Sequence, residues 1–278
     1  MWAPTSIQFD KVSPAKIKSL LPFNGLPDPG GPVASADNKR EKSLSPGEME
    51  RLSGLCLETV GALREVFEEI GKGVIPAAEP LMDRVRALAR AALTDPASLL
   101  QLTPTREDDG YTFQHSVSVG VLALALAASL GHDGEQVAEC GVAGFLHDIG
   151  KTRVDLCILD KPGKLSGDEV LEMQKHPEYG AEIVRGMTGV PPSVIEAVLG
   201  HHVRFDRTGY PESARTLCLG IPCAIVAVAD FYDATTTTRA YQRPMLRHEA
   251  VEALRRARGT VLDGSIVEGF LELTDGGD

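Results

Sequence analysis

Hydrophobic residues recur at helical spacing along most of the chain. A helix is expected to start at Ser45, Pro46 and Glu48, which form the pattern of an N-terminal capping box with proline in the first turn. A second helix is predicted from about 77 to 93, and two such amphipathic helices form a hairpin. Their expected apolar faces are Met49, Leu52, Cys56, Leu63, Val66 and Ile70, then Leu81, Val85, Leu88 and Ala92.

The apolar face of this hairpin has two interpretations. It packs on the rest of the chain, or it forms a homodimer interface through residues 46–95. Residues 1–45 are rich in Pro, Gly and Ser, which favours a flexible or extended arm. The chain is therefore divided into this arm, an N-terminal helical module at 46–100 and a larger domain at 101–278.

Helical periodicity continues through the larger domain, with Gly or Pro at most of the joints. No segment alternates with the period of two that a half-buried strand needs, so the predicted fold is all-α. The predicted helices are 109–130, 134–148, 168–174, 177–187, 191–202, 219–234, 247–258 and 262–273.

Composition agrees with a helical fold and limits the partners. Hydrophobic residues make up 43% of the chain but aromatics only 5%, so the core must be mostly aliphatic. The net charge of −11 argues against a partner that is polymeric nucleic acid. A small phosphate ligand remains compatible, since metal ions and a few cationic side chains can reverse the local field.

The expected location is cytoplasmic. The longest apolar stretch, 117–130, is shorter than the roughly 20 residues that a membrane-spanning helix needs, so no membrane insertion is expected. The N-terminus lacks the basic and apolar segments of a secretory signal. Five cysteines without a CxxC pair predict buried or half-buried free thiols in a reducing compartment.

Histidines and aspartates stand at the ends of apolar helices or inside them. Such groups are costly to bury without a partner. Each one alone has an ordinary explanation, as a capping aspartate or a hydrogen-bonded core histidine. Together they predict a helical bundle that holds a pair of metal ions. The residues are His115, His147, Asp148, His176, His201, His202 and Asp230.

Imidazole and carboxylate ligands suit transition metals better than Mg or Ca. The expected cofactors are two divalent ions, Fe or Mn in the first place, with Co, Ni and Zn left open. A carboxylate that bridges two ions, with a hydroxide between them, would provide a nucleophile for phosphoryl chemistry near neutral pH.

The order of these residues resembles the HD-GYP family, a subgroup of the HD phosphohydrolase superfamily. The likeness covers about 105–273, and its matching segments are 111–116, 145–151, 159–165, 176–180, 201–211 and 221–234. The resemblance implies an HD-type helical bundle that hydrolyses the cyclic dinucleotide cyclic di-GMP to linear pGpG. Further cleavage to GMP is left open.

The resemblance also implies a role for each site residue. The first ion would be held by His115, His147, Asp148 and Asp230. The second would be held by His176, His201 and His202, with Asp148 bridging both. Lys151 would lie near the scissile phosphate and act with Asp148 in catalysis. The substrate-binding residues would be Gly209, Tyr210, Pro211, Arg239 and Arg243. Tyr111 replaces the Glu that provides a third metal in some members, so two ions are expected.

Some positions depart from the family pattern. Val203 replaces a common Glu, Arg207 replaces a common Gly, and Gln242 replaces a basic residue. The departures predict a slow enzyme with a loosely held second ion. The alternatives are a slow or inactive cyclic dinucleotide sensor, or a scaffold that signals through partner proteins. A mononucleotide hydrolase of the HD type is disfavoured by the Gly209-Tyr210-Pro211 segment.

Overall fold

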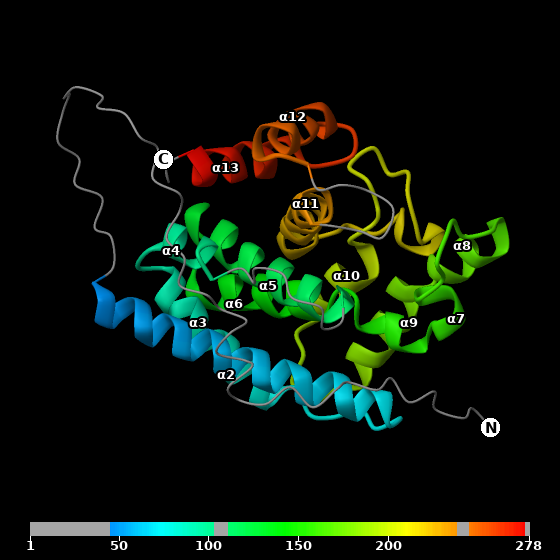
Figure 1. Ribbon diagram of the computed structural model, residues 1–278, viewed down its shortest axis with the longest axis horizontal. Coiled ribbons are helices and arrows are strands. Elements are labelled where there is room, and N and C mark those ends of the chain that lie inside the picture. Colours follow the sequence, from blue (N-terminus) through cyan, green and yellow to red (C-terminus); the bar gives the residue numbers. More distant parts are fainter. Residues whose placement is uncertain (1–44, 103–110, 238–244, 276–278) are drawn as a thin grey trace.

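The computed structural model describes residues 45–102, 111–237 and 245–275. Within these ranges the chain is a bundle of helices with two isolated β-bridges and no strand (Figure 1). The all-α prediction is confirmed. The predicted arm lies outside the described residues except for Ser45, and so do Arg239 and Arg243.

The helices agree closely with the predicted ranges, in most cases to within two residues at each end. Those expected from the sequence are α2 (Pro46–Gly71), α3 (Glu79–Ala92), α5 (Tyr111–Ser129), α6 (Gly134–Leu146), α8 (Gly167–Met173), α9 (His176–Gly186), α10 (Pro192–Gly200), α11 (Ile221–Thr236), α12 (Arg247–Ala257) and α13 (Gly264–Asp275). Those not expected are the short α4 (Pro96–Leu100) and α7 (Leu156–Leu159), and the 3-10 segments η1 (Ile149–Arg153) and η2 (Glu212–Ala214).

Helix α2 begins with the capping box that the sequence indicated. The Ser45 hydroxyl accepts a hydrogen bond from the Glu48 amide, and the Glu48 carboxylate accepts one from the Ser45 amide at 2.8 Å. These contacts satisfy amides that would otherwise lack partners in the first turn. All the predicted apolar positions of α2 and α3 are buried.

Helices α5 and α6 form the centre of the bundle. Helix α11 packs across both, and α3 packs on α6 and is covered in turn by α2. In Figure 1, α5 and α6 lie between α11 above and α2 with α3 below. The segment Thr112–Ser129 is long and apolar enough to cross a membrane, but 78% of it is buried inside the protein. Its apolar character therefore fits its central position in the core.

The N-terminal hairpin shares one continuous hydrophobic cluster with the rest of the chain. Its apolar residues are thus used inside the chain, which is the first of the two interpretations drawn from the sequence. The homodimer through 46–95 and the division into a module and a domain stay predictions.

The cysteine prediction is correct for three residues and wrong for two. Cys56, Cys140 and Cys223 are buried free thiols, but Cys157 and Cys218 are exposed. Cys157 lies on the short helix α7, which has no buried residue, and Cys218 lies in the loop between η2 and α11. Neither segment has the apolar periodicity that predicts burial.

Candidate metal centre

The predicted metal ligands come from five separate elements that meet at one point. His115 lies near the start of α5, His147 and Asp148 follow the end of α6, and His176 begins α9. The end of α10 places His201 and His202, and α11 contributes Asp230. Gly150 allows η1 to approach α9 closely, because a Cβ atom there would collide with the carbonyl oxygen of His176.

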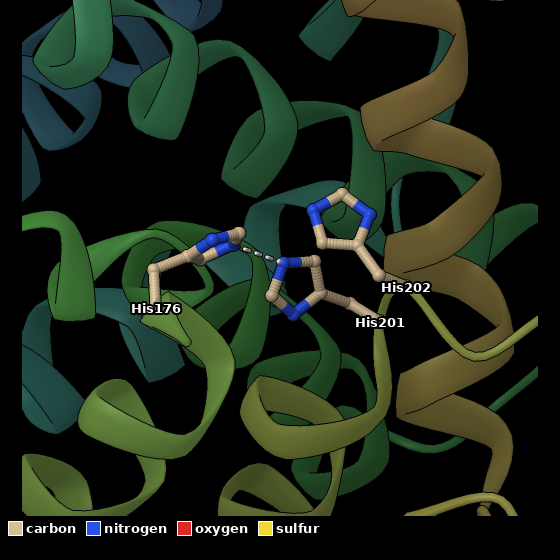
Figure 2. A group of neighbouring side chains, drawn as sticks. All are labelled: His176, His201 and His202. Atoms are coloured by element: carbon tan, nitrogen blue, oxygen red, sulfur yellow. Dashed lines mark hydrogen bonds between the residues drawn. The ribbon is translucent and has the colours of Figure 1, made fainter. Parts of the chain in front are cut away.

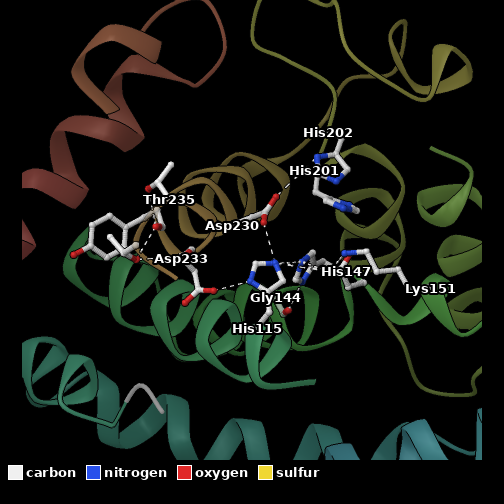
Figure 3. Close-up of polar contacts among 12 residues, drawn as sticks. His115, Gly144, His147, Lys151, His201, His202, Asp230, Asp233 and Thr235 are labelled. Atoms are coloured by element: carbon white, nitrogen blue, oxygen red, sulfur yellow. Dashed lines mark hydrogen bonds and ion pairs between the residues drawn. The ribbon is translucent and has the colours of Figure 1, made fainter. Parts of the chain in front are cut away.

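The first group of potential ligands comprises His115, His147 and Asp148. The Nε2 atoms of the two histidines are 3.3 Å apart. Asp148 Oδ2 lies 3.7 Å from the Nε2 of His115 and 3.4 Å from that of His147. On the other side, His115 Nε2 is 3.0 Å from Asp230 Oδ1. Figure 3 draws this contact as a dashed line.

The second group comprises three histidines, His176, His201 and His202 (Figure 2). The Nε2 atoms of His176 and His201 are 3.2 Å apart. The rings of His201 and His202 have centroids 4.2 Å apart. Nδ1 of His202 lies 3.9 Å from Asp230 Oδ2, so Asp230 reaches toward both groups.

Backbone carbonyls fix the orientation of three of these histidines. Nδ1 of each lies 2.8 Å from the carbonyl oxygen three residues earlier, and a carbonyl only accepts, so Nδ1–H donates and the Nε2 lone pair points into the site. The Nε2 lone pairs of His176 and His201 face each other and cannot form a hydrogen bond. The 3.2 Å between these two nitrogens instead suits two ligands of one ion, each about 2.0–2.1 Å from it. The pairs are His147 with Gly144, His176 with Met173, and His201 with Val198.

Asp148 lies between the two groups, and one of its oxygens lacks a donor. Oδ2 accepts from the Lys151 ammonium at 2.5 Å. Oδ1 is buried, lies 3.3 Å from His176 Nε2, and has no hydrogen-bond partner among the described residues. A buried carboxylate oxygen without a partner is costly, and a cation would satisfy it. This set of imidazole and carboxylate ligands therefore fits divalent transition metals. The Lys151 ammonium contacts the Asp148 carboxylate that such ions would use.

Most of the side chains are in the protonation states that metals require. Burial lowers the pKa of His176 to about 3 and that of His202 to about 4, which keeps both neutral. Burial raises the pKa of Asp148, but the Lys151 ammonium and His147 outweigh burial and hold it well below its usual range. Metals bind neutral imidazole and ionised carboxylate.

His115 differs from its neighbours. Burial lowers its pKa, but hydrogen bonds to Asp230 and Asp233 outweigh burial and raise it to about 9. The carboxylates around this imidazole therefore favour a positive charge, which a metal ion would supply in place of a proton.

A cavity of about 650 Å³ opens over both groups. Its volume is in the range of small-molecule and cofactor sites. Of the predicted substrate residues, Gly209 and Tyr210 line it, whereas Pro211 is buried and does not. Among the described residues, the lysine and arginine side chains that line the cavity are those of Lys151 and Arg204.

The segment after the histidine pair makes a tight turn that needs left-handed backbone. Gly209 has φ +90°, and a Cβ atom there would collide with the carbonyl oxygen of His202. Arg207 has φ +68°, where the family resemblance expects glycine. Its guanidinium donates to the carbonyl of Leu217 at 2.8 Å. The position of Arg207 therefore keeps left-handed backbone without glycine, at the cost of strain.

Sequence reasoning missed two residues of this site. Asp233 is buried and its Oδ2 lies 2.6 Å from His115 Nδ1. Its signal was the three-residue spacing from Asp230, which places both carboxylates on one face of α11. Arg204 lines the cavity two residues after His202. Nothing in a single sequence distinguishes this exposed arginine from other surface arginines.

The family model described as the HD domain matches residues 90–266 of this chain. The chain belongs to the HD domain family. A cyclic di-GMP phosphodiesterase of Pseudomonas aeruginosa is 35% identical to it over 209 residues, which are 75% of this chain and 50% of that protein. A 3'3'-cGAMP-specific phosphodiesterase of Vibrio cholerae is 36% identical over 148 residues, 52% of this chain and 33% of that protein.

A further cyclic di-GMP phosphodiesterase, from Thermotoga maritima, is 35% identical over 59% of this chain and 45% of its own length. The chain thus spans about half the length of the relatives it matches. Among solved structures, an HDG"Y"P protein of Bdellovibrio bacteriovorus shares the HD domain fold, with a TM-score of 0.65 and 19% identity over 86% of this chain and 75% of that one. The resemblance to the HD-GYP family is confirmed.

Proposed function

We propose that the HD domain of this chain hydrolyses cyclic di-GMP to pGpG at a site that holds two divalent metal ions, Fe or Mn. The observation that carries the proposal is Asp148. One of its oxygens faces the first group of ligands, and the other, without a hydrogen-bond partner among the described residues, faces His176 of the second group. A carboxylate in this position suits a bridge between two ions.

The ligand assignment follows the two groups. His115, His147, Asp148 and Asp230 would hold one ion, and His176, His201, His202 and Asp148 the other. When bound, the ions would supply Lewis-acid activation of the phosphate and of an attacking water. Backbone carbonyls hold three of the nitrogen ligands in place, those of His147, His176 and His201, so these three need little reorganisation on binding.

The chain's own residues would bind and orient the substrate. Lys151 lines the cavity, and 19% of its side chain is exposed. Beside the scissile phosphate, its ammonium would leave Asp148 and bind a phosphate oxygen. Arg204 would neutralise the phosphate that is not being cleaved. Tyr210 and Gly209 would form one wall of the substrate site, and Pro211 would act only by supporting that wall.

The alternative function is a sensor that binds the cyclic dinucleotide and turns it over slowly. One observation favours it. Val203 is buried and lines the cavity, so it places an apolar surface where the family resemblance expects a carboxylate. The same observation fits a slow enzyme, and the unbroken set of ligands favours the enzyme.

The cellular setting follows from the same proposal. A cytoplasmic location is supported by five cysteines without a disulfide, of which three are buried. A homodimer through 46–95 and signalling protein partners are part of the same proposal.

The test is hydrolysis of cyclic di-GMP by protein purified without oxygen or chelator, followed by chromatography of the products. The wild type is expected to yield pGpG, and Asp148→Asn and His202→Ala are expected to lose activity. A parallel reaction with 3'3'-cGAMP separates the two substrates that the relatives' names indicate. Tight binding of cyclic di-GMP with no product under Fe, Mn, Co or Ni would favour the sensor instead.

A further inference from the structure

His115 is oriented by a carboxylate, unlike the three histidines whose Nδ1 atoms donate to backbone carbonyls. Asp233 Oδ2 lies 2.6 Å from His115 Nδ1, and only 8% of Asp233 is exposed. Figure 3 draws the contact between the two side chains as a dashed line. Because a carboxylate oxygen accepts, Nδ1–H donates to Asp233, and Nε2 of His115 is directed at Asp230 and Asp148, where an ion would take the place of its proton. A carboxylate behind a metal-binding histidine fixes the ring and raises its basicity more than a neutral carbonyl does.

The two groups therefore differ in charge. Around His115 stand Asp148 Oδ2 at 3.7 Å, Asp230 Oδ1 at 3.0 Å and, behind the ring, Asp233. The second group has three imidazoles, and it shares Asp148 Oδ1 at 3.3 Å from His176. Asp230 comes no closer to it than 3.9 Å, at His202. A divalent ion is stabilised by nearby negative charge, so the first group should bind it more tightly.

We propose that Asp233 is a positioning residue: it holds His115 in the form that ligates through Nε2 and makes the His115 group the tighter of the two ion sites. The inference rests on the proposed two-metal function. It assigns to the chain an ordered loading, in which the first ion binds tightly and the second binds at a higher metal concentration.

A purely structural role for Asp233 has a different signature. The contact also joins α5 to α11 in the core, so losing it would lower the free energy of unfolding whether or not metal binds. A positioning role changes the affinity for the ion of the first group only, and it determines which nitrogen of His115 carries the proton. Metal affinity at each step and the tautomer of His115 therefore separate the two roles.

The test is a titration of the metal-free protein with Co²⁺, followed by calorimetry and by the visible spectrum of the bound ion. The wild type is expected to show a tight step and a weaker step. Asp233→Ala should weaken the tight step about 10- to 100-fold and leave the weaker step within about twofold. Asp233→Asn keeps an oxygen that accepts from Nδ1–H but loses the charge, so its effect should be smaller than that of Asp233→Ala.

The control is Asp83→Asn, which removes a carboxylate from an exposed ion pair with Arg86 on α3 and should leave both steps unchanged. A ¹⁵N spectrum of the histidines supplies the second measurement. The protein for this spectrum carries one equivalent of diamagnetic Zn²⁺, which displaces the second proton of His115. In the wild type and in Asp233→Asn, Nδ1 of His115 should carry the proton that it donates and Nε2 should ligate the ion. In Asp233→Ala, the His115 signals should move toward a mixture in which either nitrogen carries the proton.

Two results would overturn the inference while leaving the proposed function intact. In the first, the wild type binds two ions but both steps weaken equally in the Asp233 variants, or neither does. In the second, His115 keeps the same tautomer in Asp233→Ala. A wild type that binds no Co²⁺ at all would instead contradict the proposed two-metal function itself.

Discussion

The ring of Tyr210 stacks on the imidazole of His202, with ring centroids 4.5 Å apart and planes inclined by 34°. His202 is the most exposed of the proposed ligands, with 27% of its side chain accessible. Tyr210 also meets the ring of His176 edge-on, with centroids 6.1 Å apart. Tyr210 thus covers two of the proposed ligands of the second group, His176 and His202.

Tyr210→Ala is therefore expected to weaken the second ion. Aromatic pairs contribute about 0.5–1.5 kcal/mol beyond burial, which corresponds to a loss of about 2- to 10-fold in affinity. Tyr210→Phe keeps the stacked ring and should bind the second ion like the wild type. Metal titration of the three proteins measures this, and equal second-step affinities in all three would show that the stacking has no role in metal binding.

Lys151 should matter for turnover and not for metal retention. Its ammonium contacts Asp148 Oδ2 at 2.5 Å, where it competes with an ion for the carboxylate. Lys151→Ala should reduce kcat by roughly 10²–10³-fold, as expected on losing a group that stabilises developing charge. Elemental analysis should find metal content equal to that of the wild type or higher. A variant that loses activity only because it loses metal would exclude this role.

Arg207 provides a test of backbone strain. With φ +68° it occupies left-handed backbone, which costs a non-glycine residue roughly 1–2 kcal/mol. Both Arg207→Ala and Arg207→Gly lose the hydrogen bond to the Leu217 carbonyl, but the alanine variant keeps the backbone strain and the glycine variant is free of it. The glycine variant should therefore be more stable than the alanine variant by about 1 kcal/mol. Urea unfolding of both would measure the difference, and equal midpoints would show that the turn is unstrained.

Val203→Glu should improve a slow enzyme. Two carboxylates considered as replacements, Glu178 and Asp206, accept from Ser213 and Thr208, and neither lines the cavity. Neither of the two therefore replaces the missing carboxylate. The expected gain in turnover or in retention of the second ion is about 10-fold, at the low end of the effect of a residue that orients ligands.

The matched control for this change is Val203→Gln, which adds a similar volume without charge and should give less than the glutamate. A wild type that is already fast, or a glutamate variant that is slower than the wild type, would contradict the idea. The unfolding midpoint of each variant shows whether the buried position accepts the larger side chain at all.

Much of the fold could be predicted from the sequence because its signals are local. Helix α6 follows an apolar period bounded by Asp133, and α2 has a capping box at Ser45. Short elements such as α7 were missed, because four residues do not complete enough turns to show a period. The exposed cysteines were misjudged for the same reason, since they lie in segments without periodicity.

The site could be predicted only in part. Its proposed ligands lie beside apolar runs, and their order resembles that of a known family. The contact between His115 and Asp233 could not be predicted, because it joins residues 118 positions apart and depends on how α5 and α11 pack. The position of Tyr210 over His202 likewise depends on the backbone conformation of the turn at Gly209. The pattern of residues does not predict that conformation.

The count of metal ions per chain tests the two-ion site most directly. Protein purified without oxygen or chelator is expected to contain about two equivalents of Fe or Mn by elemental analysis, since the two groups share Asp148. Asp148→Asn removes the charge that serves both groups, and its metal content should fall well below one equivalent. One ion or none in the wild type, or near-normal content in Asp148→Asn, would contradict the account.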